Sequence, residues 1–146
     1  MKKAILLMVF SAGSVMLFAQ QSRNYHRNPP QSVQRSWQKD YPNYDNDNNS
    51  WDYRNSQWHR RYQDRDHNNR NADVYYDRNG RRVMSMWEWD RNELPDRVKE
   101  RIRARYRSDN YSAFRIQRPG RGIYFQIILG KNRKVYIDER GREVRY

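Results

Sequence analysis

The chain has 146 residues, which is enough for one ordinary domain and excludes a large multi-domain enzyme. It carries 30 Lys and Arg against 17 Asp and Glu, for a formal net charge of +13, and its apolar fraction of 36% is below the roughly 45–50% of a typical globular chain. Part of the chain is therefore expected to lie outside a packed core. The absence of cysteine excludes disulfide scaffolds, cysteine-ligated metals, thiol nucleophiles and lipid attachment through cysteine.

The first nineteen residues have the layout of a secretory signal peptide. Lys2 and Lys3 precede an apolar run over residues 4–18, which is shorter than the roughly 20 residues that a membrane-spanning helix needs. We therefore expect residues 1–19 to be a cleaved signal peptide and the mature chain to be periplasmic or secreted, with no transmembrane span. An uncleaved anchor is the alternative, because Leu17 stands where the cleavage motif prefers a small residue.

Residues 20–71 are polar and aromatic. They contain ten Asn and nine Lys or Arg, while Val33 is the only aliphatic residue larger than alanine. Such a segment cannot bury enough apolar surface to offset the conformational entropy of ordering, so we predict a disordered tether. Aromatic residues interleaved with Arg at 58–62 suit stacking on sugars, bases or other rings, although a solvated spacer is the favoured interpretation.

From residue 72 onward the sequence has the pattern of a folded domain. Strands are predicted at 74–77 and 81–89, joined by a turn at Asn79 and Gly80. The Asn-Gly pair predicts a tight hairpin because these residues adopt the positive φ angles that such a turn requires.

A helix is predicted over residues 95–107. Proline suits its first turn, and an apolar residue recurs every fourth position, which places an apolar stripe on one side of the helix. The stripe consists of Leu94, Val98, Ile102 and Tyr106. The opposite side is densely cationic.

Further strands follow the helix: apolar and polar residues alternate at 114–117, and a short strand ends the chain. Every second residue over 123–129 is apolar, and Val135 and Ile137 continue that face. The predicted architecture is α+β: an antiparallel sheet of four to five strands in the order ββαβββ, with one α-helix packed on one face. The predicted domain covers residues 72–146, after the signal peptide at 1–19 and the tether at 20–71.

One hairpin sequence occurs twice. Residues 74–83 read VYYDRNGRRV, and residues 135–144, which lie 61 positions later, read VYIDERGREV, with six of ten positions identical. An internal repeat explains this match. Convergence on common turn chemistry is the alternative, because Asp and Gly are favoured in hairpin turns on their own account.

A family resemblance rests on these hairpins and on the residues between them. The motifs are Tyr-Asp-x-x-Gly in a strand, Leu94-Pro95 opening a helix with Val98 and Ile102, Tyr124 in a long strand, and a closing Val-Tyr-Ile-Asp-x-x-Gly. Over roughly residues 73–146 the chain resembles the PepSY-like domains related to the β-lactamase-inhibitor fold. The resemblance implies an exported, non-enzymatic module of the Bacteroidetes type that binds a protein partner across its sheet. The chain departs from the pattern in its long tether, its Arg density and the lack of a second complete helix-plus-sheet unit.

The predicted domain has few groups suited to catalysis. It contains no Cys and no His, because His26, His59 and His67 all lie in the tether. Asp77 and Asp138 stand at turns, where a carboxylate ordinarily accepts hydrogen bonds from the local backbone. We therefore predict a protein that is not an enzyme, with no metal and no small-molecule cofactor.

Charge and aromatic residues supply the candidate binding sites. The leading hypothesis is an exported module that binds a protein partner through sheet-facing aromatics, represented by Trp87 and Tyr124. The alternative is a basic, envelope-associated protein that binds an anionic polymer such as lipopolysaccharide, polysaccharide or nucleic acid. Its candidate residues are Arg97, Lys99, Arg101, Arg103, Arg105, Arg118 and Arg121. A solvated basic face without a ligand is the alternative interpretation of the charge, and a secreted enzyme is the third hypothesis.

Overall fold

The computed structural model describes residues 28–44 and 51–145. The predicted signal peptide at 1–19 lies outside the described residues. Within those ranges, no helix has both the length and the apolar character needed to cross a membrane.

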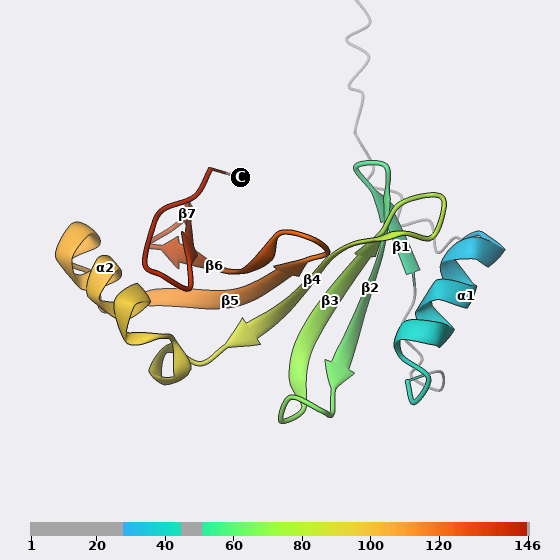
Figure 1. Ribbon diagram of the computed structural model, residues 1–146, viewed down its shortest axis with the longest axis horizontal. Helices are drawn as coiled ribbons and strands as arrows, with labels where there is room; N and C mark the ends of the chain where they lie inside the picture. The colour runs from blue at the N-terminus through green and yellow to red at the C-terminus, as the bar shows by residue number, and fades with distance from the viewer. Residues whose placement is uncertain (1–27, 45–50, 146) are drawn as a thin grey trace, which may run out of the picture.

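The described residues form one antiparallel sheet of seven strands, in which each strand pairs with the next along the chain (Figure 1). The strands are β1 (Trp51–Arg54), β2 (Gln57–Asp64), β3 (Arg70–Tyr76), β4 (Arg82–Trp89), β5 (Tyr111–Arg118), β6 (Gly122–Leu129) and β7 (Arg133–Asp138). The predicted α+β class with an antiparallel sheet is confirmed. The predicted number and order of strands are wrong, because β1 and β2 precede the expected first strand and the sheet continues without a break through residue 72.

Two helices lie on the same face of the sheet. α1 (Gln31–Asp40) packs on β1–β4, and α2 (Asp96–Tyr106) packs on β5–β7 after a short 3-10 helix, η1 (Arg91–Glu93). Trp87 belongs to the core under α1 and Phe125 to the core under α2. Both are cross-strand neighbours of Arg115. Because cross-strand neighbours point to the same face of a sheet, the two cores lie on one side of it. Figure 1 shows α1 at the β1 end of the strand series and α2 at the other end.

The predicted disorder of residues 20–71 is wrong for the described parts of that segment, 28–44 and 51–71, which hold α1, β1 and β2. Their core is aromatic: Trp37 of α1 and Tyr62 of β2 are buried, and their ring centroids lie 5.2 Å apart. An aromatic side chain buries roughly 150–250 Å². A few rings therefore replace the aliphatic residues that this part of the sequence lacks.

The two helices begin in the same way. Pro30 and Pro95 stand at their N-terminal caps, each with a φ of −54°. In both helices the residues three and seven positions after the proline are buried against the sheet: Val33, Trp37, Val98 and Ile102. α2 lies where the sequence predicts a helix, and α1 repeats its pattern with Trp in place of Ile.

The repeated hairpins are equivalent as well. The Asp77 carboxylate accepts hydrogen bonds from the backbone N–H groups of Asn79 and Arg81 and from the Arg81 guanidinium, all at 2.8–2.9 Å. Asp138 makes the same set of bonds to the residues two and four positions after it, at 2.8–3.0 Å. The predicted turn role of both carboxylates is confirmed.

A glycine joins each hairpin to a helix. A Cβ atom added to Gly80 would lie 2.5 Å from the backbone oxygen of Ser32, and one added to Gly141 would lie 2.7 Å from that of Arg97. Ser32 and Arg97 occupy the same place, two residues after the N-cap proline. The chain therefore contains two helix-plus-hairpin units in tandem, and the predicted lack of a second unit is wrong.

Trp89 connects the two units. Its side chain packs against both hydrophobic cores, and the Arg70 guanidinium lies 4.1 Å from the ring centroid. Arg115 lies 5.4 Å from the Trp89 ring and 5.2 Å from that of Trp87. Burial between the rings lowers the pKa of Arg115, and the attraction between a cation and the faces of the rings offsets part of this desolvation.

We expect Gly80→Ala and Gly141→Ala each to lower the free energy of unfolding by about 2 kcal/mol or more. The new Cβ would collide with the helix backbone, and φ is +81° and +78° at these positions. Urea denaturation measures the change. Gly130→Ala is the control, because Gly130 also has a positive φ, +55°, but open space around it. Equal losses in all three variants would contradict the role of the helix contact.

Candidate functional site

The face of the sheet opposite α1 and α2 carries no helix from the described part of the chain, and we call it the open face. Because side chains alternate along a strand and cross-strand partners share a face, the register fixes which residues point there. Its central members are His59, Arg61, Asp73, Tyr75, Met84, Met86, Phe114, Ile116, Tyr124, Gln126, Ile128 and Tyr136.

One half of the open face, on β4–β7, is apolar and aromatic. Ile116 lies between Met86 and Tyr124 in the register and is only 1% exposed, although no described helix covers it. Tyr124 is also buried, with its ring centroid 6.3 Å from that of Tyr136. The side chains of this half therefore cover one another and leave Met86, Phe114 and Tyr136 half-buried at the surface.

The other half, on β2 and β3, is polar. His59 donates from Nε2 to Oδ1 of Asp73 at 2.6 Å, and Arg61 donates from Nε to the same oxygen at 3.2 Å. The His59 ring stacks on Tyr75 with centroids 4.7 Å apart. Burial alone would raise the pKa of Asp73, but the hydrogen bonds and charges of His59 and Arg61 outweigh it and hold that pKa below its ordinary value.

The two sheet aromatics predicted to bind a partner lie on opposite faces. Tyr124 lies on the open face, as the leading hypothesis requires. Trp87 does not, because it points toward α1, is 5% exposed and belongs to the core. Its Nε1 donates to Oδ2 of the buried Asp64 at 2.6 Å. We therefore remove Trp87 from the candidate site and assign it to the fold.

Three of the five predicted cations on α2 make structural contacts. Arg101 donates from Nε to the Gly141 carbonyl at 2.8 Å, and the Arg105 Nε lies 3.1 Å from a carboxylate oxygen of Glu143. Lys99 binds the carboxylate three residues before it at 3.0 Å. The first two contacts fasten α2 to the C-terminal hairpin. Much of the predicted cationic ladder therefore stabilises the helix and its hairpin.

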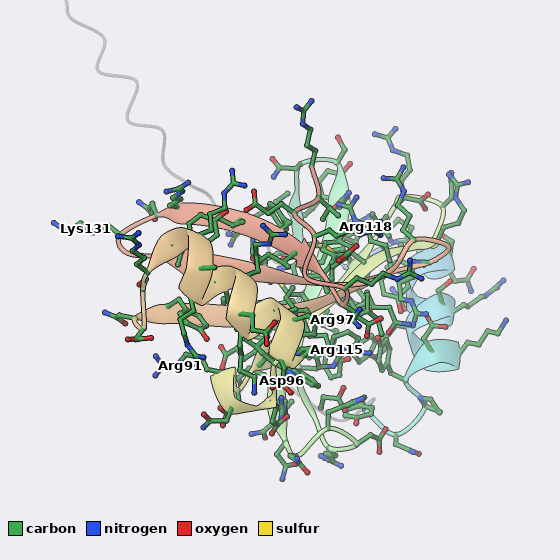
Figure 2. The ribbon with its side chains drawn as sticks, turned by 60° about the vertical axis from the view of Figure 1, so that its left-hand side comes forward. Arg91, Asp96, Arg97, Arg115, Arg118 and Lys131 are labelled. Atoms are coloured by element: carbon green, nitrogen blue, oxygen red, sulfur yellow. The ribbon has the colours of Figure 1, made fainter. Side chains whose placement is uncertain are left out.

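Arg97 and Arg103 complete the set predicted on α2. Both are exposed, and Figure 2 shows Arg97 beside α2. They do not lie on the open face, so the structure separates them from Tyr124.

Arg118 and Arg121, at the turn between β5 and β6, lie elsewhere. Together with Arg142 and Arg145 of the C-terminal segment, they line a cavity of about 290 Å³ at one corner of the open face. Tyr124 contributes to the same cavity. The structure thus brings three predicted residues, Arg118, Arg121 and Tyr124, into one place, and Figure 2 shows Arg118 where β5 ends.

The sequence interpretation missed the polar half of the open face. Residues 57–64 do alternate, with Trp58, Arg60, Tyr62 and Asp64 pointing toward α1. An arginine and an aspartate on the core side concealed this period of two. Although it is charged, Arg60 is buried, with only 7% of its surface exposed. Its guanidinium lies 4.4 Å from the centroid of the buried Trp37 ring, which offsets part of the cost of burying the charge.

Solved structures from Bacteroides have the same fold. A Bacteroides eggerthii protein described as periplasmic has a TM-score of 0.72 at 19% identity, over 82% of this chain and 88% of that chain. A DUF2874 family protein from Bacteroides ovatus has a TM-score of 0.71 at 16% identity, over 82% and 86% of the two chains. A BLIP-like protein from Bacteroides fragilis has a TM-score of 0.67 at 22% identity, over 82% and 85%. No protein-family model and no curated protein matches the sequence.

The chain therefore has the fold of these Bacteroides proteins, one of which is described as BLIP-like. This confirms the relation to the β-lactamase-inhibitor fold that the resemblance implies, while membership of the PepSY-like domains stays a prediction. The likeness covers 82% of the chain, which is more than the predicted domain of residues 72–146 alone.

We expect the free energy of unfolding to fall as the pH is lowered from about 5 toward 2. Because the pKa of Asp73 is lower in the folded chain than in the unfolded chain, the unfolded chain takes up the proton first. The stabilisation is complete above the unfolded pKa and is lost as the pH falls through the folded pKa. Asp73→Asn should flatten this decline in urea denaturation across a pH series.

Asp109→Asn is the control, since Asp109 is an exposed carboxylate just after α2. The control should keep the wild-type slope. A slope unchanged by Asp73→Asn would show that its carboxylate is not stabilised by His59 and Arg61.

Proposed function

We propose that this chain is an exported, non-enzymatic binding module whose open face binds a protein partner in the periplasm or outside the cell. The observation that carries the proposal is the group of large half-buried side chains on β4–β7, a sheet face without a described helix. Met86, Phe114 and Tyr136 belong to this group. Aromatic residues and Met are enriched at protein interfaces, and Met adapts its shape to a partner.

The rigidity of this face also supports a binding role. Ile116 and Tyr124 form a buried layer beneath the exposed part of the apolar half, and Gln126 donates to the Tyr136 hydroxyl at 2.8 Å. Side chains fixed in this way lose little conformational entropy when a partner binds. The face is therefore organised before contact.

Export and the absence of catalysis are part of the same proposal. Export is supported by the signal-peptide layout of residues 1–19 and by the periplasmic description of the Bacteroides eggerthii protein. The non-enzymatic role is supported by the lack of cysteine and by the contacts of His59 and His67, which are hydrogen-bonded to the carboxylates of Asp73 and Asp64. These contacts give both rings a structural role.

The test is capture of partners from envelope and secreted fractions by the mature full chain, at about 50 and 300 mM salt. We expect a discrete protein to be retained at both salts by the wild type and to be lost by Met86→Ala with Phe114→Ala. These truncations remove apolar contact area at the centre of the face, where binding energy concentrates. Affinity of the captured protein, measured by calorimetry, should fall at least 10-fold in the double variant.

Arg97→Gln with Arg103→Gln is the matched control, because both residues are exposed on α2 and lie off the open face. It should keep the wild-type affinity. If the control loses the partner and the open-face variant keeps it, the open face is not the binding surface.

Binding of an anionic polymer is the second candidate function. It is favoured by the net charge of +13 and by the exposure of Arg97 and Arg103. In the same capture experiment, a polymer retained only at the lower salt and lost in the α2 variant would favour this function.

A further inference from the structure

The cavity at the corner of the open face has an unusual concentration of charge. Four guanidinium groups line it, from Arg118, Arg121, Arg142 and Arg145, against the single carboxylate of Asp138. The lining therefore carries a net charge of +3. The four arginines come from two segments of the chain. β5 and the turn after it supply two, and the C-terminal segment supplies the other two.

The one carboxylate in the lining is already saturated. Asp138 accepts from the backbone N–H groups of Arg140 and Arg142, and the Arg142 guanidinium donates to its second oxygen at 2.8 Å. Burial alone would raise the pKa of Asp138, but these hydrogen bonds outweigh it and hold the pKa below its ordinary value. Asp138 therefore stays ionised and bound to Arg142, and it does not offset the charges of the exposed Arg121 and Arg145.

The cavity is continuous with the open face. Tyr124 on β6 is the cross-strand partner of Asp138 on β7, and both point to that face. Tyr124 is thus shared between the apolar half of the face and the cavity. Any protein that covers Met86 and Phe114 would also pass beside the cavity mouth.

The size and chemistry of the cavity define the group that fits it. At about 290 Å³ it is at the lower end of the range for small-ligand sites, roughly 300–1,000 Å³. Guanidinium groups bind planar oxyanions through paired N–H donors. Ile123, Tyr124 and Val144 add apolar lining, which suits the methylene groups of a side chain better than it suits an inorganic ion.

We propose that this cavity binds the carboxylate of a Glu or Asp side chain from an acidic segment of the protein that occupies the open face. The inference rests on the proposed function and specifies the chemistry of the partner. The occupant is chosen by charge complementarity, because an acidic segment brings negative charge to a lining that is mostly positive. In the proposed complex its backbone follows the surface toward Tyr124.

The probe is fluorescein-labelled hexaglutamate, titrated with the mature full chain in about 150 mM NaCl, near physiological ionic strength, and followed by fluorescence polarisation. The pocket variant is Arg121→Gln with Arg145→Gln, because both residues are exposed and line the cavity. The matched control is Arg78→Gln with Lys131→Gln, which removes the same charge from two exposed turns outside the lining. Labelled hexaglutamine gives the background of a neutral peptide.

We expect the pocket variant to weaken hexaglutamate binding at least about 10-fold, the loss typical of a charge-assisted contact, and the control to change it less than about 2-fold. Arg121→Lys with Arg145→Lys should recover only part of the affinity, because lysine keeps the charge without the paired donors. Equal losses in the pocket variant and the control would overturn the inference, since overall charge would then account for binding. Inorganic phosphate is the competitor, added at a concentration equal to that of the peptide's carboxylate groups. Displacement of the peptide under this condition would overturn the assignment to an acidic side chain.

The inference and the proposed function fail in different ways. If the captured protein binds wild type and pocket variant equally but is lost by Met86→Ala with Phe114→Ala, the proposed function stands and the inference is wrong. If hexaglutamate binds the pocket and no protein depends on the open face, the proposed function fails and the cavity is a carboxylate site without that partner.

Discussion

The structure depends on one contact that occurs twice, in which a hairpin glycine lies directly against the backbone of the first helical turn. No side chain separates Gly80 from Ser32 or Gly141 from Arg97, so this distance cannot be adjusted by a change of rotamer. The Asp carboxylate three residues before each glycine holds the hairpin in shape, and the N-cap proline fixes where the helix begins. Because both contacts place a helix on the same side of the sheet, no helix of residues 28–44 and 51–145 covers the opposite side.

The two units reach similar geometry with different core chemistry. Under α1 the core is built from rings such as Trp37 and Tyr62, whereas under α2 it is built from aliphatic residues such as Ile102 and Ile127. At the junction, Trp89 contacts both cores and is flanked by the guanidinium groups of Arg70 and Arg115. A guanidinium group over an indole ring tolerates partial burial. Arginine side chains can therefore fill the junction between the two cores in place of aliphatic residues.

The sequence predicts the aliphatic second unit better than the aromatic first unit. Aliphatic alternation in residues 123–129 and the stripe of α2 predict their elements well, because Ile, Val and Leu mark buried positions with little ambiguity. In the first unit the hairpin of β3 and β4 was predicted, but β2 was missed. Polar Arg60 and Asp64 occupy core-side positions of β2 and are buried by a ring and by hydrogen bonds that only the folded chain supplies. The candidate cations were misjudged for a related reason: contacts from Arg101 and Arg105 to the C-terminal hairpin join residues about 40 positions apart. Tyr124, in contrast, could be assigned, since its place in a long alternating strand puts it opposite the helix.

The distribution of charge on the open face limits which proteins could cover it. On β2 and β3 the carboxylate of Asp73 is matched by His59 and Arg61, and the centre around Ile116 is apolar, so neither region selects a charged partner strongly. The corner at Arg118 and Arg121, in contrast, has an excess of positive charge. At physiological salt, charges separated by more than about 8 Å are largely screened, which reduces the influence of the distant α2 cations on a group bound at that corner. A net charge of +13 can draw many acidic partners toward the chain, and in the proposed interface the arginines at this corner supply the fixed point that orients one of them across the sheet.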